Sequence, residues 1–310
     1  MYAFGVDIGG TTVKMGLFDE NATVLDKWEI PTRKEEGGTL ILPDVAKSIL
    51  AKMEEKGITE KDIKGIGMGA PGAWNDKGVM VGGAVNLGWT DVNIPAVMSQ
   101  YFSVPVKANN DANVAALGEM WQGGGKGYTE MVAVTLGTGV GGGIIIGGKI
   151  LIGANGAAGE FGHMQIDDHE TEACGCKRYG CLEQYTSATG IVRLAKRRLA
   201  KDEEPSMLRQ GEISAKAVFD AVKAGDKVAI QIAEQFGDYL GKGLAAVAEV
   251  VNPEAFVIGG GVSKAGDILL SFVEPAFKKY VFYPCANVKF RLATLGNDAG
   301  IFGAAALILN

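Results

Sequence analysis

Two stretches of the chain share one pattern, in which apolar strands are joined by glycine-rich turns. A strand predicted over residues 2–7 runs into Gly9-Gly10-Thr11-Thr12 and continues as a second strand over residues 13–19. A strand predicted over residues 132–136 likewise runs into Gly137-Thr138-Gly139 and continues over residues 143–147. The repeated layout indicates one domain architecture that is used twice.

Apolar residues at helical spacing mark several of the intervening segments. Apolar side chains four residues apart precede Gly57, which predicts a helix that ends at a glycine. A longer apolar stripe predicts a helix over residues 227–251. The alanine-rich segment 300–309 predicts a final helix that packs back on the first domain.

The order of these elements predicts an α/β protein of two domains. A strand over residues 255–258 leads into a third glycine turn, Gly259-Gly260-Gly261. We expect residues 1–115 and 296–310 to form one domain and residues 116–295 to form the other.

Composition narrows the class of protein. The chain has 310 residues, of which 47% are hydrophobic and 21% charged, so it has enough apolar side chains for packed cores. The net charge of −6 and the lack of a basic block argue against a nucleic-acid partner. No apolar run is long enough to predict a membrane span, and the N-terminus enters a strand without the pattern of a signal peptide. We therefore expect a cytoplasmic protein.

Two glycine motifs resemble nucleotide-binding patterns without satisfying them. Gly137-x-Gly139-x-x-Gly142 matches the dinucleotide pattern, but the β-branched run Ile144-Ile145-Ile146 that follows predicts a strand where that motif requires a helix. Gly143-x4-Gly148-Lys149 is followed by Ile150, where a P-loop needs a serine or threonine for magnesium. We reject both interpretations.

The turns themselves can hold phosphate, because backbone N–H groups and threonine hydroxyls can approach it closely there. Asp7 adds an acid that can hold magnesium, and Lys14 adds a cation. Tight hairpin turns without a ligand are the alternative for each turn. The three turns together favour ATP and Mg²⁺, with these residues as the expected binding set: Asp7, Gly9, Gly10, Thr11, Thr12, Lys14, Gly137, Thr138, Gly139, Gly259, Gly260 and Gly261.

Three of the four cysteines are clustered. Cys174, Cys176 and Cys181 lie close together in the sequence, and His163 precedes them. Three thiolates and one imidazole are the ligands of a closed tetrahedral zinc site, so we expect a structural zinc ion. Buried free thiols are the alternative, and the other histidine, His169, is expected to be solvated.

The apolar run over residues 104–108 predicts a parallel strand, and the segment Asn109-Asn110-Asp111-Ala112-Asn113 follows at its end. A hydroxyl nucleophile needs a nearby carboxylate to accept its proton, and an adjacent amide can fix neighbouring hydroxyls. Asn110 and Asp111 supply such a pair. A turn or the N-cap of the following helix explains the same residues equally well, so both interpretations stay open at this point.

The sequence resembles the ROK family of bacterial sugar kinases and repressors over essentially its full length. The resemblance rests on these motifs: Asp7-Ile8-Gly9-Gly10-Thr11, Asn110-Asp111-Ala112-Asn113, Leu136-Gly137-Thr138-Gly139, Gly159-Glu160-Phe161-Gly162-His163 and Cys174-x-Cys176-x4-Cys181-Leu182-Glu183. It implies the two-domain sugar-kinase fold, which is actin-like or ribonuclease H-like, with duplicated domains around a central cleft.

The resemblance also implies roles for individual residues. It makes Asp111 the catalytic base and His163 a zinc ligand, and it places these residues on sugar hydroxyls: Asn110, Asp111, Glu160, His163 and Glu183. Gly72 and Asn86 look like part of the other wall of the sugar pocket. One position departs from the family pattern, because Lys177 stands where a glycine usually follows the second cysteine.

The resemblance favours a kinase over a repressor, because the first strand begins at residue 2 and the chain is acidic. The run that follows Glu183 is most similar to members that phosphorylate glucose at its 6-hydroxyl with ATP. Kinases of fructose, N-acetylmannosamine or N-acetylglucosamine remain alternatives, as does a sugar-sensing protein without catalysis. Family membership further implies a homo-oligomer, a dimer or a tetramer.

Overall fold

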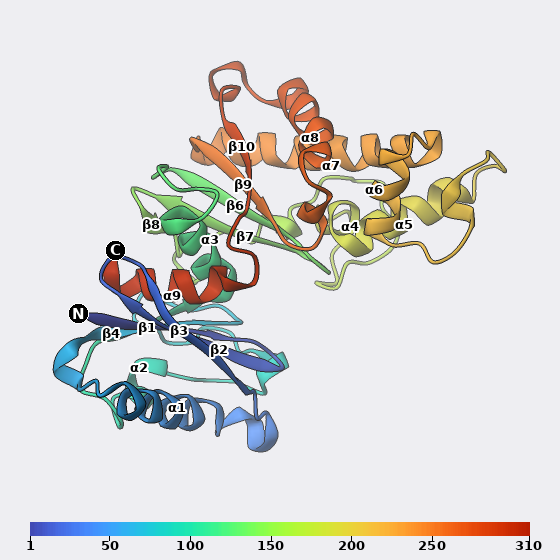
Figure 1. Ribbon diagram of the computed structural model, residues 1–310. Coiled ribbons are helices and arrows are strands. Elements are labelled where there is room, and N and C mark those ends of the chain that lie inside the picture. Colours follow the sequence, from blue (N-terminus) through green and yellow to red (C-terminus); the bar gives the residue numbers. More distant parts are fainter. The chain divides into compact units, whose positions relative to one another are not determined.

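Two five-stranded sheets organise the chain in the computed structural model, which describes residues 1–310 (Figure 1). The first sheet has the order β3-β2-β1-β4-β5 and consists of β1 (Tyr2–Ile8), β2 (Thr12–Asp19), β3 (Val24–Pro31), β4 (Ile63–Ala70) and β5 (Val106–Asn110). The second has the order β10-β9-β6-β7-β8 and consists of β6 (Met131–Leu136), β7 (Val140–Ile146), β8 (Lys149–Ile150), β9 (Ala255–Gly259) and β10 (Lys289–Leu292).

The two sheets have the same topology. In the first, β1 is parallel to β4, β4 is parallel to β5, and β2 is antiparallel to β3. In the second, β6 is parallel to β9, β9 is parallel to β10, and β7 is antiparallel to β8. Each strand of one sheet thus has a counterpart in the other, which confirms the duplicated α/β architecture expected from the repeated turns.

The helices are α1 (Ile41–Lys56), α2 (Ile94–Met98), α3 (Asp111–Gln122), α4 (Glu183–Thr186), α5 (Ala188–Leu199), α6 (Ala215–Lys223), α7 (Lys227–Val251), α8 (Asp267–Tyr280) and α9 (Ala299–Leu309). The predictions of a glycine-terminated helix and of a long helix over residues 227–251 are confirmed. Gly57 caps α1 with a φ of 65°, which is the left-handed conformation that glycine adopts without steric cost.

The strand ahead of Asp111 lies two residues later than predicted. Residues 104–108 were the expected strand, whereas β5 spans Val106–Asn110 and pairs Asn110 with Ala70 of β4. Pro105 explains the shift, because proline has no N–H to donate to a sheet and therefore precedes the strand.

The chain folds as two compact units. Unit 1 comprises residues 1–129, 143–159 and 295–310, and unit 2 comprises residues 130–142 and 160–294. Unit 1 is larger than the domain expected from the sequence, because α3 continues without a break to Gln122 and packs along α9.

Unit 1 has helices on both faces of its sheet. Phe4, Val6 and Ile8 of β1 point into a core that they share with the apolar side of α1. Gly5 and Asp7 alternate with these residues and face α9, which Figure 1 shows beside β1. One face of the strand therefore supplies packing, and the other brings a carboxylate to the helix.

Close backbone contacts hold α9 against its neighbours. A Cβ atom added at Gly303 would lie 1.6 Å from the carbonyl oxygen of Val114 in α3. One added at Gly67 of β4 would lie 1.7 Å from the carbonyl oxygen of Ala304. Only glycine permits these approaches, and they fix α9 against α3 and the middle of β4.

None of the helices combines the length and the apolar character that spanning a lipid bilayer requires.

Candidate active site

Two half-buried carboxylates interact electrostatically in unit 1. Asp7 lies near the end of β1, opposite Lys14 in the β1–β2 pairing, and Asp111 is the first residue of α3. The pKa of Asp7 is raised to about 6, mainly by burial and then by the charge of Asp111, while the charge of Lys14 acts in the opposite direction. Burial also raises the pKa of Asp111, against the backbone N–H of Ala112, which donates to its Oδ1 at 2.8 Å. Carboxyl groups with raised pKa values are candidates for metal binding or proton transfer.

Asn110 is the N-cap of α3. Its Oδ1 accepts hydrogen bonds from the backbone N–H groups of Ala112 at 2.9 Å and Asn113 at 3.1 Å. Its Nδ2 donates to the carbonyl oxygen of Gly72 at 2.9 Å. The capping interpretation left open by the sequence is therefore correct for the side-chain oxygen. The amide group thus holds Gly72, and hydrogen bonding from the Asn110 side chain also lowers the pKa of Asp111, against the effect of burial.

The segment after β4 places Gly72 beside that cap. Gly72 has a φ of 97°, and the indole N–H of Trp74 donates to the carbonyl oxygens of Ala70 and Pro71, each at 3.1 Å. Trp74 is fully buried, so it anchors the turn on the core of unit 1. The predicted sugar-binding residues Gly72 and Asn110 are thus brought into direct contact.

The first glycine turn joins β1 to β2. Gly9 donates its N–H to the carbonyl oxygen of Thr12 at 3.0 Å and so closes the turn. Thr32 makes two hydrogen bonds to the turn. Its N–H donates to the carbonyl oxygen of Thr11 at 2.9 Å, and its hydroxyl donates to the carbonyl oxygen of Gly9 at 2.7 Å. Asn86 is exposed beside the turn, with its Nδ2 3.9 Å from a Cβ atom added at Gly10.

The second and third glycine turns meet in unit 2. Gly137-Thr138-Gly139 joins β6 to β7, and Gly259-Gly260-Gly261 follows β9. A Cβ atom added at Gly260, whose φ is 86°, would lie 2.5 Å from the carbonyl oxygen of Leu136. The third turn therefore packs directly on the strand that leads into the second.

His163 and the three clustered cysteines converge on one point in unit 2. Their ligand atoms all lie within 4.8 Å of one another. The Sγ atoms of Cys176 and Cys181 are 3.6 Å apart, and Cys174 Sγ is 3.9 Å from His163 Nδ1. A tetrahedron with zinc–sulfur bonds of about 2.3 Å has edges of about 3.8 Å, so the donor set fits zinc. His169 is exposed, as expected.

The turn of the cluster accommodates Lys177. Lys177 has a φ of 68°, so it occupies the left-handed conformation in which glycine would be unstrained. Its N–H donates to the carbonyl oxygen of Cys174 at 2.8 Å. The departure from the family pattern thus adds local strain without displacing a ligand.

Glu183, at the start of α4, touches both the cysteine cluster and the second glycine turn. Its Oε1 lies 2.9 Å from Cys174 Sγ and 3.6 Å from His163 Nδ1. Its Oε2 accepts a hydrogen bond from the N–H of Val140 at 3.3 Å. The predicted sugar residue Glu160 directly precedes the 3₁₀ turn Phe161–His163 and is exposed.

A buried ion network anchors the loop that carries the cluster. Both carboxylate oxygens of Glu170 accept from the guanidinium of Arg197 at 3.0 Å, and Arg193 pairs with the same carboxylate. The hydroxyl of Tyr185 donates to Glu170 at 2.6 Å. These partners hold the pKa of Glu170 well below its usual range despite the cost of burial. The loop is therefore fixed to α5.

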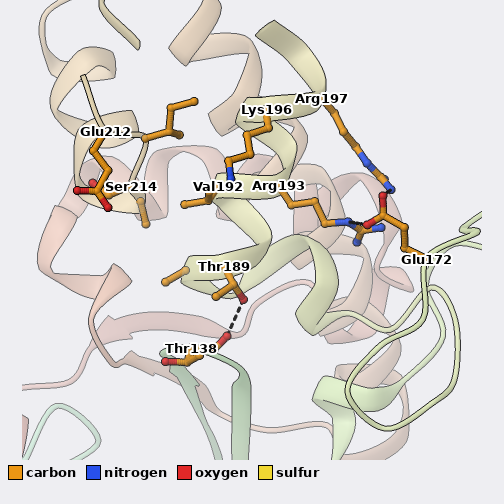
Figure 2. A pocket seen from close by; sticks show the side chains of 12 residues that line it. Thr138, Glu172, Thr189, Val192, Arg193, Lys196, Arg197, Glu212 and Ser214 are labelled. Carbon is orange, nitrogen blue, oxygen red and sulfur yellow. Dashed lines mark hydrogen bonds and ion pairs between the residues drawn. The ribbon is translucent and has the colours of Figure 1, made fainter. Parts of the chain in front are cut away.

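An open pocket of about 700 Å³ lies next to the second glycine turn (Figure 2). Figure 2 shows Thr138 and Thr189 joined by a hydrogen bond at one end, the cationic side chains of α5 along one wall, and Glu212 and Ser214 on another. Its lining is Thr138, Glu172, Ala188, Thr189, Val192, Arg193, Lys196, Arg197, Glu212, Ile213, Ser214 and Ala215. Of these residues, only Thr138 was expected from the sequence to bind a ligand. Ala188 and Thr189 fall in the run after Glu183, which was given no binding role, and the others belong to no motif.

Comparison with known proteins gives one consistent result. The model of the ROK family matches residues 3–310. A glucokinase from Halalkalibacterium halodurans is 43% identical over 309 residues, which cover 98% of this chain and 94% of that protein.

Two solved structures resemble the chain over nearly its whole length. One is a ROK family glucokinase from Streptomyces griseus in complex with glucose and AMPPNP, at 34% identity and a TM-score of 0.76, covering 99% of each chain. The other is a ROK hexokinase from Thermus thermophilus, at 31% identity and a TM-score of 0.81, covering 99% of this chain and 98% of the other.

Proposed function

The chain belongs to the ROK family, and we propose that it is a glucokinase that transfers the γ-phosphoryl group of ATP to the 6-hydroxyl of glucose. The observation that carries the proposal is Asp111, a half-buried carboxylate at the start of α3, beside Asn110 and in electrostatic interaction with Asp7. The resemblance to glucokinases of known structure and sequence supports glucose as the sugar.

Asp111 is the general base of the proposed reaction. Burial raises the pKa of Asp111, which makes its carboxylate a stronger base toward the attacking hydroxyl than a solvated carboxylate would be. It accepts the proton of the 6-hydroxyl as the oxygen attacks phosphorus. Asn110 and Gly72 orient the sugar from one side, together with Asn86, and Glu160, His163 and Glu183 supply further hydroxyl contacts.

The glycine turns hold the phosphates through their backbone N–H groups. Asp7 would hold Mg²⁺, which would neutralise charge on the phosphates. The pocket of about 700 Å³ next to Thr138 takes the nucleoside portion of ATP, since it adjoins a phosphate turn and has a partly apolar lining. His163 and the three cysteines would hold zinc, which supplies rigidity to the sugar-binding His163.

The test is Asp111→Asn, which keeps the size and a hydrogen-bonding oxygen of the side chain. We expect turnover in a coupled ADP-release assay with glucose to fall by about 10²–10⁴-fold, while glucose binding measured by calorimetry is retained. The exposed Asp91→Asn is the matched control and leaves turnover unchanged. An Asp111→Asn enzyme with wild-type turnover contradicts the assignment of the base.

A panel of sugars tests the substrate. We expect phosphorylation of glucose to exceed that of fructose, N-acetylmannosamine and N-acetylglucosamine, because a site built for each hydroxyl rejects analogues that leave its groups unpaired. Binding of glucose without ADP release would instead identify a sugar-sensing protein. We further propose a cytoplasmic homo-oligomer without a nucleic-acid partner, and light scattering of the purified protein checks its mass.

A further inference from the structure

The first two residues of α5 donate hydrogen bonds to carbonyl groups of the second glycine turn. The backbone N–H of Ala188 donates to the carbonyl oxygen of Gly137 at 2.8 Å. The hydroxyl of Thr189 donates to the carbonyl oxygen of Thr138 at 2.7 Å, the contact drawn in Figure 2. Two successive carbonyl groups of the turn therefore point toward α5.

The hydrogen bonds to these two carbonyl groups also determine where the backbone N–H groups of the turn point. In a trans peptide the C=O of one residue and the N–H of the next point in opposite directions, and the chain has no cis peptide. Because the carbonyls of Gly137 and Thr138 face α5, the N–H groups of Thr138 and Gly139 face away from it. Phosphate oxygens are bound by N–H groups arrayed in this manner.

Capping of α5 does not account for the hydroxyl of Thr189. Ser187 is the N-cap of this helix, and its Oγ accepts the N–H of Gly190 at 3.0 Å. Thr189 is exposed and lines the pocket, so it adds nothing to a hydrophobic core. Thr189 Oγ1 also lies 2.9 Å from the Oγ of Ser187, but Ser187 donates its own hydrogen to the carbonyl oxygen of Glu183. The shorter contact of Thr189, at 2.7 Å, is with the glycine turn.

The first glycine turn, in unit 1, is held by a similar pair of hydrogen bonds. Thr32, which follows β3, donates its N–H to the carbonyl oxygen of Thr11 and its hydroxyl to that of Gly9. In both turns one backbone N–H and one threonine hydroxyl fix two carbonyls, although Thr32 and Thr189 come from unrelated elements, a strand end and a helix start. Two independent occurrences favour a shared purpose.

We propose that Thr189 is a positioning residue for nucleotide binding, whose hydroxyl aims the N–H groups of the turn Gly137-Thr138-Gly139 at the phosphates of ATP, and that Thr32 does the same for the first turn. The inference rests on the proposed kinase function for its ligand. Neither hydroxyl needs to touch ATP, since each acts through the peptide groups it holds.

The test compares Thr189→Val, which keeps the shape and loses the donor, with Thr189→Ser, which keeps the donor. We expect Thr189→Val to raise the KM for ATP and the Kd for ADP about tenfold, the usual effect of one lost hydrogen bond, with the KM for glucose unchanged. Thr189→Ser stays within about twofold of the wild type. Thr32→Val and Thr32→Ser should differ in the same direction.

Thr59→Val is the control for loss of a bonded hydroxyl elsewhere, because Thr59 donates to Asp62 at 2.7 Å in an exposed turn, and it should leave both constants unchanged. The inference is overturned if Thr189→Val binds ADP like the wild type, if Thr189→Ser loses as much affinity as Thr189→Val, or if the wild type binds no ADP. If the wild type binds ADP but phosphorylates no sugar, only the proposed function is refuted, because the comparison of ADP binding between wild type and Thr189 variants needs no turnover.

Discussion

At the scale of single residues, the sequence could predict which residues belong to the site, but it could not predict how deeply they are buried or which charges lie near them. Asp7 and Asp111 were both named from motifs, yet nothing in the motifs indicates that the charge of one raises the pKa of the other. That effect depends on the fold, which brings the end of β1 next to the start of α3. The same limit applies to Glu170 and to Thr189, whose partners lie far away in the sequence.

Asp7 gives a prediction about pH. Its pKa is raised from 3.8 to about 6, so the folded protein binds a proton there more tightly than the unfolded chain does. The stabilisation from that proton is complete below about pH 4 and is lost as the pH rises through 6. Above pH 6 the buried charge costs up to about 3 kcal/mol, since each unit of pKa corresponds to about 1.4 kcal/mol.

Asp7→Asn removes that cost. We expect the variant to be more stable than the wild type by about 1–3 kcal/mol at pH 8, to lose this advantage near pH 4, and to be inactive as a kinase. Urea unfolding at both pH values measures the difference, with the exposed Asp91→Asn as a control that shows no gain. Equal stability of Asp7→Asn and wild type at pH 8 would refute the assigned shift.

At the scale of elements, periodicity predicted the helices well where one face is buried, as in α7 and α1. The start of β5 was misplaced because the apolar pattern extends across Pro105, whereas the hydrogen-bonding pattern cannot. The position of α9 was foreseen only in outline. The glycines that allow its close packing add no apolar side chain to the sequence pattern, so the pattern does not show where α9 packs.

Packing of α9 gives a second prediction. Gly303→Ala would place a methyl group 1.6 Å from the carbonyl oxygen of Val114, so the two helices must separate. We expect a loss of about 3 kcal/mol or more in the free energy of unfolding, a large effect for one added carbon. Gly82→Ala, where the added atom meets open space, should cost little. Thermal unfolding of both variants tests the contact, and matched melting temperatures would speak against it.

The metal loop gives a third prediction. Metal analysis of the purified protein should find one zinc per chain, and Cys176→Ala should lower the zinc content to near zero and reduce the melting temperature, because the ligands cross-link the loop only through the ion. Cys285→Ala, which removes the one cysteine outside the cluster, should change neither quantity. Wild-type protein without zinc would exclude the site.

At the scale of the whole molecule, the repeated glycine turns predicted the duplication, and strand order confirms it in detail. The division into units was harder to foresee, because it follows spatial neighbours and not continuous sequence. Residues 143–159 join unit 1 although they are preceded by a segment of unit 2, and Gly143 shows why. A Cβ atom added there would lie 2.4 Å from the Cβ of Ala116, so this segment packs on α3.

The late position of α9 in the chain affects folding during translation. A ribosome that has reached Thr294 has made every residue of unit 2, but unit 1 still lacks the helix that covers one face of its sheet. The glycine-lined side of β1 and β4 therefore stays uncovered until residues 295–310 have left the ribosome. Unit 1 begins first and is completed last, which reverses the usual order in which nascent domains mature from the N-terminus.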